Sequence, residues 1–169
     1  MADPGKRPQT VALSEVSTAV IDRLVGMHMD YYGHHFAFGK VFQQTISKDL
    51  LMFSRGLPDP NSRLWLVVSG GDVLGSIAID GACLGEGRAQ LRWFILDQTL
   101  RSQGFGLKLL DTAINFCKTN GFREIHLWTF SDLHAARTRY LQQGFRCVEE
   151  AHGAQWGREV LEQRYLLEL

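Results

Sequence analysis

The feature that most restricts the fold is a strand–helix–strand unit in the second half of the chain. Ala89–Leu96 and Glu124–Phe130 are apolar runs of strand length, and Gly106–Asn120 between them repeats its apolar residues at helical spacing. Two strands joined through a helix lie parallel in one sheet, with a right-handed crossover. The fold must therefore contain a parallel strand pair with a helix packed across it.

The remaining segments predict antiparallel strands and further helices around this unit. Gly70-Gly71-Asp72 is a hairpin signal between two strands, and the glycines of Tyr31–Gly39 indicate a loop between the first two helices. Strands are expected at 9–13, 63–69, 73–80, 145–155 and 160–169, and helices from Ser17 onward, from about Val41 to Gly56 and over 133–143. The fold class is α+β, with a mixed, mostly antiparallel central sheet of about six to seven strands and flanking helices.

Composition limits the classes of function. The 169 residues fit one domain, which we place at 9–169 behind a disordered lead at 1–8 that lacks the apolar core of a signal peptide. Lysine plus arginine equals aspartate plus glutamate, at 18 each, so nothing in the charge predicts a nucleic-acid partner. No apolar run is long enough to predict a membrane span. The three cysteines have no zinc or redox spacing, which indicates reduced thiols in the cytoplasm and no metal site.

The junction between the 89–96 strand and the next helix has the features of an anion-binding turn. It reads Arg101-Ser102-Gln103-Gly104-Phe105-Gly106, so two glycines open a helix soon after a strand. Glycine permits positive φ and close approach of a ligand, and the free N–H groups of a first helical turn attract an anion. Arg101 adds a positive charge for the same phosphate. The alternative is that the glycines serve only tight packing, and neither a Walker A loop nor a Rossmann fingerprint fits the segment.

Two motifs together resemble the GNAT superfamily of N-acetyltransferases. Arg101, Gly104 and Gly106 match the superfamily's Arg/Gln-x-x-Gly-x-Gly/Ala signature, and Ala135–Phe145 resembles its Ala-x-x-x-Tyr-x-x-x-Gly-Phe stretch. The resemblance runs from about the first helix to the C-terminus. The phrase Leu127–Ala136, with Met27-His28, Tyr31-Tyr32 and Phe42, is most similar to acetyltransferase domains fused to MarR-type regulators. The regulator half is absent here, so DNA binding is not implied.

The resemblance implies a site for acetyl-CoA between the two parallel strands. The backbone of Phe94, Ile95 and Leu96 would pair with the pantetheine arm, and the turn from Arg101 to Gly106 would hold the pyrophosphate. Leu133 and Ala136 would also contact the cofactor. Many superfamily members have an asparagine where Leu133 stands, so that contact differs in this chain.

Tyr140 is the catalytic residue that the resemblance implies. Its hydroxyl would donate a proton to the departing thiolate while an amine attacks the thioester directly, although a tyrosine packing its ring on the sheet is the alternative. The general base stays open. Glu86, Asp80, His28 and His126 are candidates, each with a structural role as the alternative, and a water chain could serve instead.

The acceptor site is expected at the loop after the first helix. His28, Tyr31, Tyr32 and Arg92 are the candidate substrate-binding residues, with His34 and His35 near them. A cation on an inner strand needs a partner, so Arg92 binds either a substrate carboxylate or a side chain such as Glu86 or Glu124. The carboxylate reading would favour amino-acid-like acceptors. The nearby histidines lack metal-ligand spacing.

Two classes of function fit these observations. One is an acetyltransferase acting on a small amine or a protein amine, with a homodimer compatible with the resemblance. The other is a non-catalytic acyl-CoA-binding or sensor module of the same fold. A nucleotide-binding dehydrogenase is excluded because the sheet order differs and no ribose-binding acid follows the glycines.

Overall fold

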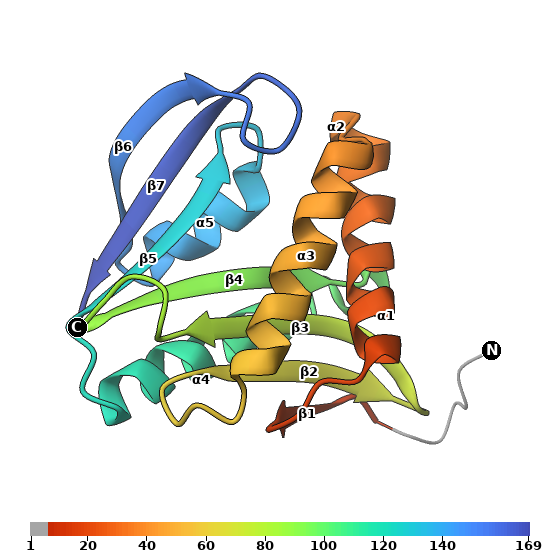
Figure 1. The fold of residues 1–169 in the computed structure, drawn as a ribbon, viewed down its shortest axis with the longest axis vertical. Helices are drawn as coiled ribbons and strands as arrows, with labels where there is room; N and C mark the ends of the chain where they lie inside the picture. Colours follow the sequence, from red (N-terminus) through yellow and green to blue (C-terminus); the bar gives the residue numbers. More distant parts are fainter. Residues whose placement is uncertain (1–6) are drawn as a thin grey trace.

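The computed structural model describes residues 7–169 and contains one seven-stranded sheet (Figure 1). The strands lie in the order β1-β2-β3-β4-β5-β7-β6, and only the β4–β5 pair is parallel. The strands are β1 (Gln9–Leu13), β2 (Arg63–Ser69), β3 (Asp72–Asp80), β4 (Arg88–Leu96), β5 (Glu124–Phe130), β6 (Arg146–Gly153) and β7 (Val160–Glu168). The helices are α1 (Thr18–His28), η1 (Met29–Gly33), α2 (His34–Phe36), α3 (Lys40–Gly56), η2 (Gln98–Leu100), α4 (Phe105–Thr119) and α5 (His134–Gln142). The expected mixed, mostly antiparallel sheet with flanking helices is confirmed.

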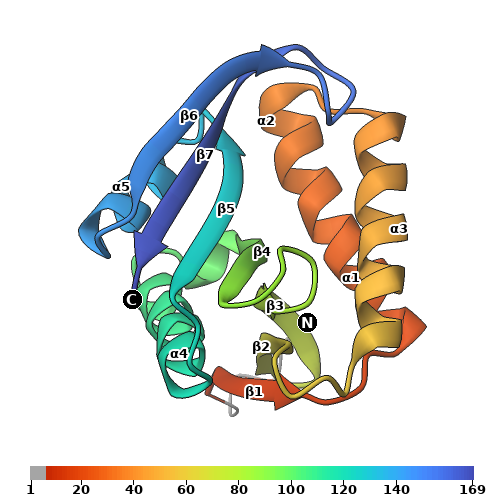
Figure 2. The ribbon, with the colours of Figure 1, turned by 60° about the vertical axis from the view of Figure 1, so that its left-hand side comes forward.

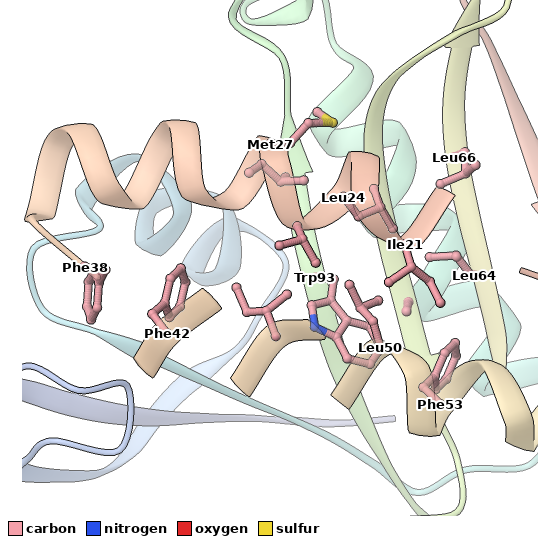
Figure 3. Close-up of a cluster of buried hydrophobic side chains, with 14 of the residues drawn as sticks. Ile21, Leu24, Met27, Phe38, Phe42, Leu50, Phe53, Leu64, Leu66 and Trp93 are labelled. Atoms are coloured by element: carbon pink, nitrogen blue, oxygen red, sulfur yellow. The ribbon is translucent and has the colours of Figure 1, made fainter. Parts of the chain in front are cut away.

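Helices cover both faces of the sheet and enclose two apolar cores. One core lies between the sheet and the pair α1–α3, where Leu24, Leu50 and Phe53 lie around Trp93 of β4 (Figure 3). The second core lies on the other face, where Leu109, Leu110 and other residues of α4 pack on the strands. The apolar residues expected on one side of a helix at 106–120 therefore form the face that α4 buries.

The two parallel strands diverge soon after they meet. Arg88, Ala89 and Gln90 pair with 124–126, and the β4–β5 ladder ends there. Beyond that point β5 continues with β7 and β6 as a wing that turns away from β4 (Figures 1 and 2). The divergence separates the backbones of two neighbouring strands in the middle of the sheet.

A β-bulge in β4 changes which side chains face each core. The register with β3 shifts between Ser76 and Ala78, and Trp93 has a φ of 47°. The Ser76 hydroxyl donates a hydrogen bond to the Trp93 carbonyl oxygen at 2.6 Å. This bond satisfies a carbonyl that the shifted strand register leaves without a backbone partner. As a result Arg92 and Trp93 both face α3, whereas Phe94 faces the α4 side.

Most expected boundaries are close to those observed, with one correction. The loop expected from Tyr31 is wrong because the helix continues through η1, a π-helical turn, and α2. Gly33 has a helical φ of −66°, and the chain leaves the helix only at Ala37, whose φ is 54°. A glycine is compatible with a helix, so it does not by itself mark the end. The expected lead at 1–8 lies mostly outside the described residues.

Two local predictions are confirmed by hydrogen bonds and backbone angles. Ser17 caps α1, and its hydroxyl accepts from the Val20 amide at 3.3 Å. Gly70 and Gly71 join β2 to β3, both with positive φ. Among residues 7–169, no helix is long and apolar enough to cross a membrane.

Candidate functional site

A cavity of about 440 Å³ lies where β4 and β5 diverge. Its walls combine segments that are far apart in the sequence, because α1, α3, both diverging strands, α5 and the β6–β7 loop all reach it. The lining residues include His28, Tyr32, Phe42, Thr45, Asp49, Gln90, Arg92, Trp93, Phe94, Trp128, Thr129, Phe130, Leu133, Ala136, Tyr140 and Trp156.

Six residues expected to bind cofactor or acceptor line this one cavity, together with the expected catalytic residue Tyr140. The six are His28, Tyr32, Arg92, Phe94, Leu133 and Ala136. The divergence of the strands explains the convergence, since it lets side chains from both faces of the sheet reach a common space. The cavity can therefore hold two reactants that approach from opposite sides of the sheet.

Tyr140 lies buried at the α5 side of the cavity. Its side chain is 6 % exposed, and its ring packs against Phe94, Phe145 and Tyr165 at centroid distances of 6.2, 5.8 and 6.1 Å. Burial raises the pKa of the Tyr140 hydroxyl above its ordinary value. The group therefore stays protonated over the whole physiological range and can act as a proton donor.

The β4 backbone beyond the bulge has one free edge. Ile95 and Leu96 pair with Ser76 and Gly75 of β3, whereas the ladder with β5 has already ended at Gln90. Main-chain N–H and C=O groups of 94–96 on the β5 side are available to an extended ligand. This edge fits the amide groups of a pantetheine arm, which would take the place of a strand.

The turn before α4 has the geometry of an anion site. Gly104 is the N-cap with a φ of 82°, and a Cβ added there would meet nothing within 4 Å. The first hydrogen bond within the helix joins the Lys108 amide to the Gly104 carbonyl. The amides of the first helical turn, before Lys108, therefore have no partner inside the helix and point outward from its N-terminus. Ser102, Gln103 and Gly104 are exposed.

Gly106 is constrained by packing rather than by its backbone angles. A Cβ there would lie 3.1 Å from Arg139 Nε and 3.3 Å from Leu96 Cδ1. The glycine thus lets the start of α4 lie close to both β4 and α5. The two glycines of the turn are required for different reasons, one for conformation and one for close approach.

A smaller cavity of about 270 Å³ adjoins the turn on the α1 side. Tyr31, His34, His35 and Arg101 line it, with Ile95 and Leu96 at its base. The Arg101 guanidinium lies over the Tyr31 ring at 4.9 Å from the centroid. Tyr31 and Tyr32 are adjacent in sequence but face different cavities, so Tyr31, His34 and His35 lie beside Arg101 and not in the larger cavity.

His28 is the histidine that reaches the larger cavity. It is 4 % exposed, and its Nδ1 lies 2.7 Å from the Leu24 carbonyl oxygen. A carbonyl only accepts, so Nδ1 carries the proton and Nε2 is an acceptor. Burial lowers the pKa of His28 to about 4, and its ring stacks on Tyr32.

The other candidate bases are engaged or lie elsewhere. Asp80 Oδ1 accepts from the amides of Ala82 and Cys83 at 3.1 and 3.2 Å. His126 Nε2 lies 2.9 Å from Glu124 Oε2. Glu86 is exposed on the β3–β4 loop. Asp80, Glu86 and His126 do not line the larger cavity, whereas His28 does.

Arg92 has other partners than those expected. Its Nη2 lies 2.7 Å from Asp49 Oδ2 of α3, and its Nη1 lies 3.4 Å from Asp80 Oδ2. The expected partners Glu86 and Glu124 are wrong because Arg92 faces α3, while Glu86 stays in solvent and Glu124 pairs with His126.

Sequence reasoning missed Asp49, Thr129 and Trp156 of the cavity wall. Asp49 lies one turn after Thr45 on the side of α3 that borders its apolar face. A carboxylate beside the apolar face of an amphipathic helix was the sequence signal that could have indicated Asp49 as a site residue. Thr129 Oγ1 is buried and has no hydrogen-bond partner in the described part of the chain. Within residues 7–169, no group of three or more His, Cys, Asp or Glu side chains is arranged to hold a metal ion.

Comparison with known proteins places the chain in a family. The model of the acetyltransferase (GNAT) family matches residues 23–145, so the chain belongs to that family. Curated relatives include human N-acetyltransferase 8, 28 % identical over 107 residues that are 62 % of this chain and 47 % of the relative. Rat N-acetyltransferase 8 is 31 % identical over 124 residues, 69 % of this chain and 56 % of the relative. The chain thus spans about half the length of the curated relatives it matches.

Solved structures share the fold at low identity. A GNAT-family acetyltransferase from Staphylococcus aureus has a TM-score of 0.75 at 19 % identity, covering 95 % of this chain and 99 % of the other. A putative streptothricin acetyltransferase from Bacillus anthracis, solved with acetyl coenzyme A, has a TM-score of 0.59 at 18 % identity over 69 % and 68 % of the two chains. These likenesses establish the fold.

Proposed function

We propose that this protein is an acetyl-CoA-dependent N-acetyltransferase that uses a primary amine as acceptor, with both substrates bound together. The observation that carries the proposal is the continuity of three features: an outward-facing helix N-terminus at Gly104, a free strand edge at 94–96, and a cavity that contains Tyr140. The bacterial structure with bound acetyl coenzyme A shares the fold and supports the same ligand here.

In this proposal the residues act in sequence along the ligand. The turn Arg101–Gly106 binds the pyrophosphate through amides other than those of Arg101 and Gln103, which bond the carbonyls of Gln98 and Leu100. The 94–96 edge bonds the pantetheine arm, and Leu133 and Ala136 pack against it. Acetyl-CoA supplies an activated acyl thioester when bound. A backbone N–H of the strand edge stabilises negative charge on the thioester oxygen. Tyr140 donates its proton to the departing sulfur, since its raised pKa keeps the proton in place.

The proton of the attacking amine needs an exit from the cavity. His28 Nε2 faces the cavity as an acceptor, but a pKa near 4 makes it a weak base. His28 is therefore better suited to hold a water than to take the proton itself. A water chain to solvent completes the exit.

A second candidate function is a binding module without turnover. Leu133 is 7 % exposed and offers a hydrocarbon side chain to the cavity. The resemblance to the GNAT superfamily implies an asparagine at this position in many members, so this difference favours an altered cofactor geometry. Thiol release from acetyl-CoA with a panel of primary amines, beside calorimetric titration of acetyl-CoA, separates the two. Binding without release for every amine supports the module, and absence of binding rejects both.

We also make proposals about the kinship, location and partners of the protein. The phrase 127–136 supports kinship with domains fused to MarR-type regulators, and the free thiols of Cys83, Cys117 and Cys147 support a cytoplasmic location. We propose no nucleic-acid or membrane partner. A homodimer that pairs sheet edges on this side of the molecule would use β6, because β6 forms the edge and β7 lies inside the sheet.

A further inference from the structure

An ion network occupies the α3 side of the larger cavity. Arg92 bonds Asp49 at 2.7 Å and Asp80 at 3.4 Å, and its guanidinium lies over the Trp93 ring at 4.3 Å. Both terminal nitrogens and one face of the guanidinium are therefore engaged. A ligand carboxylate at Arg92 would have to approach two protein carboxylates, which repel it.

The charge balance of this network is negative. Two carboxylates and one guanidinium leave a net formal charge of −1. His28, the other basic side chain of the cavity wall, is neutral above about pH 4 because it is buried. Asp49 binds Arg92 through Oδ2, and its Oδ1 accepts no hydrogen bond from the residues that the structure describes. The cavity therefore presents one carboxylate oxygen held in place by Arg92 and suited to a cation.

Aromatic rings line the same cavity as this carboxylate and Tyr140. Tyr32 contacts Phe42 at 5.1 Å and Phe130 at 6.2 Å, and Phe130 contacts Trp156 at 6.0 Å between centroids. These four residues line the cavity, so the body of a ligand meets apolar and aromatic surface there.

One side chain of the wall adds a polar atom close to the cavity. Thr129 is 6 % exposed and lines the cavity from β5, and its buried hydroxyl has no hydrogen-bond partner within residues 7–169. A buried hydroxyl without a partner costs free energy.

We propose that the acceptor is a primary amine with an apolar or aromatic body and no carboxylate. Asp49 binds this amine as its ammonium, which gives one proton to the water chain before the neutral nitrogen attacks the thioester. The inference rests on the proposed acetyl transfer and names the acceptor class of that reaction. Arg92 is then a positioning residue for Asp49 and not a ligand for substrate. Amino-acid-like acceptors, one of the two readings of Arg92 from sequence, are rejected by the same argument.

The test compares amines with the amino acids that differ from them by one carboxylate. Thiol release from acetyl-CoA is measured with tyramine and tyrosine, tryptamine and tryptophan, and cadaverine and lysine. We expect kcat/KM for the favoured amine to exceed that of its amino acid about tenfold or more, because a carboxylate would meet Asp49 and Asp80. Equal or better use of the amino acids would overturn the inference while leaving acetyl transfer intact. No release from any compound would reject the proposed function itself.

A charge-neutral variant tests the role of Asp49 directly. Asp49→Asn should lower kcat/KM for the favoured amine about tenfold to a hundredfold, because a charge-assisted hydrogen bond is lost. The ratio of kcat/KM for this amine to kcat/KM for its amino acid should also fall. Its Kd for acetyl-CoA should not change. Asp22→Asn, which removes an exposed carboxylate of α1, is the matched control and should behave as the native protein.

A conservative variant keeps the test decisive if Asp49→Asn folds poorly. Asp49→Glu retains the charge and should keep more of the amine preference than Asp49→Asn does. A preference unchanged in Asp49→Asn would remove Asp49 from acceptor binding. An Asp49→Glu protein that folds but loses as much kcat/KM as Asp49→Asn would also remove Asp49 from acceptor binding.

Discussion

At the scale of single residues, burial decides which side chains of the cavity can carry a proton. Tyr140 and His28 are both buried in its wall, and burial disfavours the charged form of each. Tyr140 is thereby kept as a donor and His28 as a neutral acceptor. The same physical cause gives the two residues opposite hydrogen-bonding roles.

Removing the Tyr140 hydroxyl should reduce turnover more than binding. We expect Tyr140→Phe to lower kcat about a hundredfold while the Kd for acetyl-CoA changes little, because the ring keeps its packing and only the proton donor is lost. Steady-state thiol release and calorimetry measure the two quantities. Tyr165→Phe is the control, since Tyr165 is also buried but bonds Gln163 away from the cavity. Equal kcat for native and Tyr140→Phe proteins would exclude Tyr140 from the reaction.

His28 should make the folded state sensitive to acid. Its pKa is about 4 when folded and 6.5 when exposed, so the unfolded chain binds more protons between these values. The stabilisation is complete above about pH 6.5 and is lost as the pH falls to 4, a change of about 3 kcal/mol. Urea unfolding of native protein at pH 7 and pH 4.5 measures this loss.

The comparison that isolates His28 uses two substitutions. His28→Gln should lose less stability between the two pH values than the native protein, whereas His152→Gln, at an exposed position of β6, should lose as much. Identical pH dependence in His28→Gln and native protein would show that the buried imidazole does not set the acid sensitivity.

At the scale of elements, α4 offers an internal comparison between its two ends. Gly104 precedes the first turn of α4 with a φ of 82°, and Gly121 follows its last turn with a φ of 75°. A Cβ added at either glycine would have no described atom within 4 Å. A side chain at either position strains the backbone by a similar amount, about 1 kcal/mol. Only the first position lies at the proposed pyrophosphate site.

We therefore expect Gly104→Val to lose acetyl-CoA affinity and Gly121→Val to keep it. The valine at 104 would disturb the turn that presents the outward-facing amides, while the valine at 121 acts at the opposite end of the helix. Calorimetry gives the affinities, and thermal unfolding verifies that both variants lose similar stability. Unchanged affinity in Gly104→Val would reject the placement of the pyrophosphate.

The elements also show where sequence reasoning succeeds. The parallel pair, the hairpin at Gly70-Gly71 and the cap at Ser17 were predicted because each depends on residues close together in the chain. The loop expected at Tyr31–Gly39 was wrong because Gly33 has no need of positive φ there. The bulge at Trp93 had no sequence signal, since it depends on the register with β3.

At the scale of the whole molecule, the sheet consists of two parts joined by a short ladder. Three residue pairs link β4 to β5, and the wing of β5, β7 and β6 continues beyond them. A ligand bonded along the free edge of β4 would bridge the two parts (Figure 2). Binding and stability should therefore be strongly linked.

Acetyl-CoA should stabilise the protein and protect particular amides. At a concentration 100 times its Kd, the gain in unfolding free energy is about 2.7 kcal/mol. Hydrogen exchange should slow at 94–96 and at the first turn of α4, where ligand bonds replace water, and should stay unchanged in β1 at the far edge of the sheet. Protection confined to other segments would contradict the proposed path of the ligand.

Local sequence was sufficient to place the strands and the longer helices, the parallel pair and the glycine turn, because periodicity and backbone requirements act between near neighbours. Packing in three dimensions settled the rest. It separated Tyr31 from Tyr32, gave Arg92 the partners Asp49 and Asp80, and brought α3 to the cavity. These outcomes depend on the bulge in β4 and on the divergence of β4 from β5, which arise only when distant strands pair and so leave no trace in any short stretch of sequence.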